Sequence, residues 1–229
     1  MKLTRLHVIL LLTTALCLPA GTGNAQTSAI AGVVSLPTAS TQQRVFRGNL
    51  YRNRLVPDRS GPARVVPRSP FDDVVISAHP LDFQSPMANA PPAVRMDQQA
   101  ARFVPRVLPV TAGARVEFVN QDRFYHNVFS LAPKFDIGRR ATGVVVDQVF
   151  ATPGMVEIFC DIHPQMSATV LVLDTKWFTQ PDSTGNFRLD GLPDGRYELH
   201  AYHPEHDEIR RTVVIGGGTA LMQTFTFGR

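Results

Sequence analysis

The chain has 229 residues, of which 44% are hydrophobic and 18% charged, and its formal net charge is +4 at pH 7. That apolar content is sufficient for a core, which excludes a wholly disordered protein. After the N-terminus there is no run of about 18 or more apolar residues, which excludes a protein with several membrane-spanning helices. The 18 prolines and 16 glycines, set among runs rich in Val, Thr and Phe, favour an all-β chain with many turns.

Residues 1–25 are typical of a secretory signal peptide. Lys2 and Arg5 form a positive start, residues 8–18 an apolar core, and small residues precede the expected cleavage site. We therefore expect a periplasmic or secreted protein, with an uncleaved anchor as the alternative. Cleavage would leave Cys160 as the remaining cysteine, so no internal disulfide could form, and this thiol would be buried, paired with another chain or bound to a metal.

Residues 44–68 form a basic segment with seven arginines and one acidic residue. The segment also holds three prolines and two glycines and follows neither a strand nor a helix period, so we interpret it as a surface loop or flexible arm. An exported protein rarely meets nucleic acid, so we expect no nucleic-acid partner. Attraction to an acidic partner or an anionic membrane surface is the functional interpretation, and a merely solvated loop is the alternative.

Short β-prone runs follow one another along the rest of the chain at the spacing expected of a β-sandwich. They lie at 29–36 and 74–78, then at 103–110, 115–120, 127–131, 143–150, 154–160 and 167–173, and finally at 186–189, 195–202, 208–215 and 220–227. No window has the period of an amphipathic helix.

The residues that carry chemistry lie in one short loop directly after a predicted strand. Cys160, His163 and Met166 place a thiol, an imidazole and a thioether at intervals of three residues. These ligands suit copper in both oxidation states, and His126, at the start of another predicted strand, would add a second imidazole. Two histidines, one cysteine and a weak axial methionine make up the type 1, or blue, copper site of electron-transfer proteins.

The residues around these four resemble a cupredoxin domain, to which we assign residues 99–175. The resemblance rests on the stretches at 103–105, 116–122 and 126–128 in its first half, and on Phe159, Cys160 and the ligand loop in its second half. The Cys-x-x-His-Pro-x-Met loop is most similar to that of amicyanin. The wider pattern resembles cupredoxin-domain proteins described as methylamine utilization proteins.

The resemblance implies a Greek-key β-sandwich that binds one type 1 copper per chain. His126, Cys160 and His163 would be the equatorial ligands and Met166 the axial one, while Asn127 matches the position that ties the two ligand-bearing loops together by hydrogen bonds. It also implies an electron carrier, and not an enzyme, that passes single electrons from a donor to an acceptor redox protein.

Other readings of the same residues stay open at this point. A zinc site and a Cys–His nucleophile pair are the alternatives for the site. Copper storage or delivery without rapid redox cycling, and a copper oxidoreductase with a second centre, are the alternatives for the function.

Residues 176–229 form a second module in which strands alternate with glycine-containing turns. The stretch 182–199 resembles a carboxypeptidase regulatory-like, or transthyretin-like, β-sandwich of the Ig-like kind. The four strands predicted in roughly fifty residues cannot close such a sandwich alone. We therefore expect the runs at 29–36 and 74–78, within residues 26–98, to complete it, which makes the cupredoxin-like domain an insertion in the second sandwich.

Histidines in the second module raise the question of a second metal site. His200 and His203 would face opposite sides of a strand, and Pro204 ends that strand before His206. We therefore expect solvated or core histidines here, with a second metal site as the alternative. His79 is likewise interpreted as structural.

Overall fold

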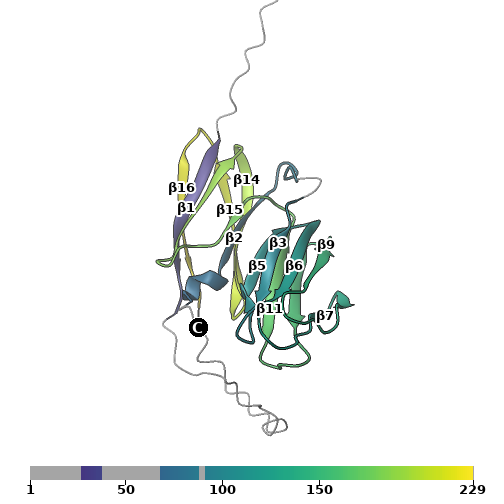
Figure 1. Ribbon diagram of the computed structural model, residues 1–229. Coiled ribbons are helices and arrows are strands. Elements are labelled where there is room, and N and C mark those ends of the chain that lie inside the picture. Colours follow the sequence, from purple (N-terminus) through teal and green to yellow (C-terminus); the bar gives the residue numbers. More distant parts are fainter. Residues whose placement is uncertain (1–26, 38–67, 88–90, 229) are drawn as a thin grey trace, which may run out of the picture.

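The computed structural model describes residues 27–37, 68–87 and 91–228 (Figure 1). The predicted signal peptide lies outside the described residues, and so does the Arg-rich segment except for Arg68. The described chain is built of strands, apart from the short 3-10 helix η2 (Pro70–Asp73), so the predicted all-β class is confirmed. No helix among these residues is long and apolar enough to cross a membrane.

Two sheets form a first sandwich, which we call the site sandwich. Its sheets have the strand orders β5-β11-β10-β7-β8 and β4-β3-β6-β9. The strands are β3 (Val94–Gln98), β4 (Phe103–Val104), β5 (Val107–Thr111), β6 (Ala114–Asn120), β7 (Phe129–Leu131), β8 (Lys134–Asp136), β9 (Val145–Phe150), β10 (Gly154–Phe159) and β11 (Ser167–Leu173). Buried side chains from both sheets, among them Met96, Phe118, Ile158 and Val170, make one core between them.

The site sandwich begins before the predicted boundary at residue 99, because β3 is one of its strands. β3 pairs in parallel with β6, and its Met96 is fully buried. Its other face carries Arg95 and Asp97, which form an ion pair of 2.6 Å. These alternating charges leave β3 without the apolar run by which the other strands were predicted.

The predicted strand 103–110 is in fact two strands, β4 and β5, which belong to opposite sheets. Pro105 lies between them, and a proline offers no backbone N–H to a strand ladder. The predicted strand 127–131 begins only at Phe129, where β7 starts, and is followed by β8, which the sequence did not suggest.

The second sandwich also has two sheets, of orders β13-β1-β16 and β12-β2-β14-β15. Its strands are β1 (Ser28–Ser35), β2 (Val75–Pro80), β12 (Phe178–Thr179), β13 (Asn186–Leu192), β14 (Gly195–His203), β15 (His206–Ile215) and β16 (Ala220–Thr226). β1 lies between β13 and β16, and β2 lies between β12 and β14. Figure 1 shows β1 beside β16. Strands from before and after the site sandwich therefore share one core, which includes Ile30, Ile76, Leu199 and Phe225.

The two sandwiches meet over a small apolar cluster and several polar contacts. Val75, Val107 and Leu173 are buried together at the junction. Arg106 of the site sandwich donates to Glu205 of the second sandwich at 2.7 Å. The Tyr202 hydroxyl lies 3.3 Å from the sulfur of Met155.

Candidate metal centre

Three predicted ligands converge at one end of the site sandwich. His126 lies in the loop between β6 and β7, Cys160 directly follows β10, and His163 lies in the loop between β10 and β11. One nitrogen or sulfur atom of each residue lies within 4.8 Å of the others. The fold thereby brings His126 and Cys160, which are 34 positions apart in the sequence, to the same point.

Strand pairing explains why they meet. β10 pairs with β11 along its whole length and with β7 through Phe159 and Phe129. Cys160 is the residue after Phe159, so it emerges beside the residues that lead into β7. There the backbone N–H of Asn127 donates to Cys160 Sγ at 3.4 Å. This backbone contact links the two ligand-bearing loops, whereas the Asn127 side chain accepts the backbone N–H of Val128 through Oδ1 at 2.7 Å.

The His126 ring is fully buried and held from behind by a carboxylate. Its Nδ1 faces Cys160 Sγ at 3.9 Å, and its Nε2 lies 2.7 Å from Asp122 Oδ2. Asp122 is fixed in turn by the backbone N–H groups of Ala100 and Ala101, at 2.7 and 2.9 Å. A carboxylate on one ring nitrogen orients the ring and raises the basicity of the other nitrogen, which here points at the thiol.

Asp122 had no role in our sequence-based prediction. Its position four residues before His126 was the available signal, but that spacing is informative only when the loop geometry is known.

His163 carries a polar atom that needs a partner. Its Nδ1 is buried and forms no hydrogen bond with the described residues. Leaving a buried nitrogen without a hydrogen-bond partner costs about 1–3 kcal/mol. An unpaired nitrogen beside a thiol and a second imidazole is therefore suited to bind a metal ion. The rings of His126 and His163 have centroids 4.8 Å apart, and Phe124 packs against both.

Met166 lies in the same buried cluster as Cys160 and is only 1% exposed. Its backbone N–H donates to the carbonyl oxygen of His163 at 2.9 Å, which closes the ligand loop into a tight turn. On the opposite loop, the Gln98 side chain donates to the carbonyl of Asn127 at 3.0 Å. Hydrogen bonds thus hold both loops independently of any ion.

The electrostatics of the site favour the metal-binding protonation states of Cys160 and His163, whereas at His126 they favour a ring proton that a bound metal would have to displace. Burial lowers the pKa of His126, but Cys160 and Asp122 outweigh it, and the pKa is raised. Burial raises the pKa of the Cys160 thiol, but His126 and the backbone N–H groups of Asn127, His163 and Ile162 bring it below its usual value. Burial and the neighbouring His126 lower the pKa of His163. A thiolate and a neutral imidazole are the forms that coordinate a metal.

The donor set fits copper. A thiol and two imidazoles converge on a buried point where one nitrogen has no partner, and a thioether lies in the same cluster. Sulfur donors combined with imidazoles are the set that suits copper in either oxidation state.

No protein-family model matches the sequence, and no curated protein matches it. Among solved structures, part of the chain is similar to a purple cupredoxin from Nitrosopumilus maritimus, with 23% identity, a TM-score of 0.32, and coverage of 35% of this chain and 99% of that one. The Cu(I) form of an amicyanin mutant is 21% identical, with a TM-score of 0.34 and coverage of 42% and 99%. A Cu-containing nitrite reductase from Thermus scotoductus SA-01 is 26% identical, with a TM-score of 0.35 and coverage of 47% of this chain and 27% of that one.

Proposed function

We propose that the protein is an exported electron carrier that holds one type 1 copper ion through His126, Cys160, His163 and Met166. The observation that carries this proposal is the convergence of two imidazoles and a buried thiol around a nitrogen that has no other partner. Bound copper would supply a one-electron couple between Cu(I) and Cu(II).

The chain's own residues would hold the ligands still while the charge changes. Asp122 fixes the His126 ring, and the N–H of Asn127 donates to the Cys160 sulfur. Because each contact is made within a loop anchored by strands, the ligand side chains would be held in place whether or not the ion is bound. A site that keeps its geometry has a small reorganisation cost, as rapid one-electron transfer requires.

The side of the site near His163 is suited to brief contact with a redox partner. His163 is partly exposed, and Phe124, which packs against it, is 41% exposed. Ile162 and Pro164 flank the histidine in the same loop. Small apolar surfaces fit redox encounters, which typically bury less than about 1,200 Å² in total. We propose that the donor and the acceptor dock here.

The Arg-rich segment would assist such encounters with acidic partners. Its charge predicts attraction that weakens with salt, because exposed charges are screened over about 10 Å at 0.1 M ionic strength. Electron-transfer rates that fall with salt, and fall less in a chain lacking residues 44–67, would support this role.

Spectroscopy of the copper-loaded protein tests the proposal. We expect intense visible absorption from a copper–thiolate bond in the wild type, and its loss in Cys160→Ser. Ser167→Ala, an exposed change beside the same loop, is the matched control and should keep the colour. A colourless copper-loaded wild type would refute the assignment. A site that holds Cu(I) alone and readily passes it to a chelating acceptor would support storage or delivery instead.

A further inference from the structure

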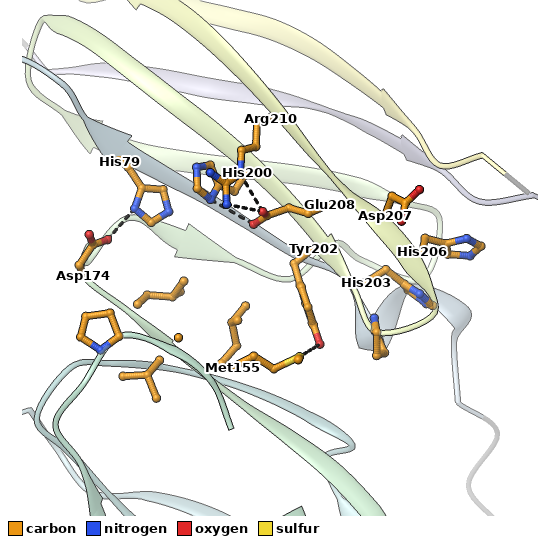
Figure 2. Close-up of a pocket in the computed structure, with 16 residues that line it drawn as sticks. His79, Met155, Asp174, His200, Tyr202, His203, His206, Asp207, Glu208 and Arg210 are labelled. Carbon is orange, nitrogen blue, oxygen red and sulfur yellow. Dashed lines mark hydrogen bonds and ion pairs between the residues drawn. The ribbon is translucent and has the colours of Figure 1, made fainter. Parts of the chain in front are cut away.

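A second group of polar side chains lies at the junction of the two sandwiches (Figure 2). It lines a cavity of about 640 Å³, with residues of β10 and β11 on one side and of β2, β14 and β15 on the other. The histidines of the described chain that lie outside the metal centre all line this cavity: His79, His200, His203 and His206.

Strand register brings two of these histidines together. In the antiparallel pair of β2 and β14, His79 lies opposite Glu198, and His200 lies two residues further along β14. Positions two apart share one face of a strand, so His79, Glu198 and His200 face the same side of the sheet. The rings of His79 and His200 pack with centroids 4.2 Å apart.

Three carboxylates surround this pair of rings. His79 Nδ1 lies 2.6 Å from Asp174 Oδ1. His200 Nε2 lies 2.7 Å from Glu198 Oε2, and its Nδ1 lies 3.1 Å from Glu208 Oε1. Figure 2 shows Asp174 reaching His79 from the site sandwich, and dashed lines join Glu208 to both His200 and Arg210. These histidines and carboxylates therefore come from three strands of one sheet and from the segment that follows β11.

The pairing of these groups depends on protons. A neutral imidazole has one N–H, so His200 can donate to both Glu198 and Glu208 only when its ring is protonated. Burial, and then the adjacent His200, lower the pKa of His79, which opposes a charge on both rings at once. The cluster thus holds three carboxylates beside two rings that cannot both be charged easily.

We propose that this cluster is a second metal site, for a divalent transition-metal ion such as Zn²⁺ or Cu²⁺. Imidazoles and carboxylates are ligands for such ions, and the ion would replace the protons that now link the rings to the carboxylates. The ligands would be drawn from His79, His200, Glu198, Glu208 and Asp174. In this structure these side chains pair with one another, and His79 and Glu208 also pair with Ser77 and Arg210, at 2.9 and 2.8 Å, so their donor atoms would turn toward the ion when it binds. Because Asp174 follows a strand of the site sandwich and the others belong to the second sandwich, the ion would cross-link the two.

The other two histidines of the cavity lie outside this site. His203 is buried against Phe227, and its Nδ1 accepts the backbone N–H of Glu205 at 3.1 Å. His206 packs against His203, with ring centroids 4.7 Å apart. His206→Gln therefore removes a histidine from the same cavity without touching the proposed ligands, which makes it a matched control.

Zinc binding to the full chain tests the proposal. In a Cys160→Ala/His163→Ala background, which removes two of the three converging donors of the first site, we expect one Zn²⁺ per chain by metal analysis and calorimetric titration. His79→Gln and His200→Gln should each weaken this binding by roughly tenfold or more, and His206→Gln should leave it unchanged. Absence of the ion in this double variant, or an affinity that neither substitution changes, would overturn the proposal.

Two further measurements keep the outcome independent of folding defects and of the proposed electron transfer. Glu208→Gln, a substitution of nearly equal size, should also weaken zinc binding while the thermal unfolding of the metal-free protein stays unchanged. Cu²⁺ added to the same double variant should give a spin-resonance spectrum whose nitrogen splitting changes in His79→Gln and stays the same in His206→Gln, and a spectrum that His79→Gln does not change would count against the site. Failure of the visible copper band in the wild type would leave these results untouched, because Cys160 is absent from the chain tested.

Discussion

Replacing Asp122 by asparagine would test whether the carboxylate behind His126 tunes the proposed copper centre. The wild-type carboxylate accepts from Ala100, Ala101 and the His126 ring, at 2.7, 2.9 and 2.7 Å. An amide of the same size has one oxygen and one NH₂ group, so it must face at least one of these donors with a donor of its own. It also removes a negative charge from a place where the carboxylate side chain is 11% exposed and the ring 0%.

The size of the effect follows from that contact. Outer carboxylates on ligand histidines are worth on the order of 10–100-fold in metal affinity, which is about 1.4–2.7 kcal/mol. Cu(II) carries one more positive charge than Cu(I) and loses more when the carboxylate charge is removed. If the affinity for Cu(II) falls about tenfold more than the affinity for Cu(I), the reduction potential rises by about 59 mV for a one-electron couple.

Copper titration and protein-film voltammetry of Asp122→Asn would measure both quantities. Asp161→Asn is the matched control, because Asp161 directly follows Cys160 but is exposed and pairs with Arg139 at 3.2 Å. We expect Asp161→Asn to change the affinity and the potential little. Equal values for the two variants would refute a specific role of the Asp122–His126 contact and leave only a diffuse charge effect.

Two further predictions concern the second sandwich. The buried Tyr197 hydroxyl donates to the carbonyl of Pro193 at 2.8 Å, and burial, followed by Asp194, raises its pKa to about 12. The unfolded chain releases this proton from about pH 10 upward. The free energy of unfolding should therefore fall between about pH 10 and 12, by up to ~1.4 kcal/mol per pH unit. Denaturant titrations of Tyr197→Phe should lack this fall, and the same pH profile in wild type and variant would contradict the prediction. In Gly32→Ala, the new methyl group would collide with the carbonyl oxygen of Gln223 where β1 meets β16. We expect thermal unfolding to show that the free energy of unfolding falls by about 1–3 kcal/mol or more. Gly228→Ala should cause no such fall, because its added carbon meets nothing within 4 Å. A Gly32→Ala protein as stable as the wild type would mean that β1 does not pair there.

Sequence alone suggested three of the four candidate metal ligands, because Cys160, His163 and Met166 form a local pattern. A thiol, an imidazole and a thioether within seven residues need no tertiary information to suggest a soft-metal site. The strands were readable for the same reason, since apolar runs and turn residues mark them one by one. Where the local signal was weak, the prediction failed: β3 carries charges on its outer face, and Pro105 divides an apparently continuous run between two sheets.

Only the tertiary structure decided which side chains support the ligands and which meet at the junction. Asp122 stands behind His126 because its loop folds back onto the ring, a geometry that a spacing of four residues does not specify. His79 and Asp174 are 95 positions apart, and they meet because two sandwiches pack against each other. Strand periodicity predicts the face on which a residue lies. It does not encode the register or the neighbouring domain, and these set its partners.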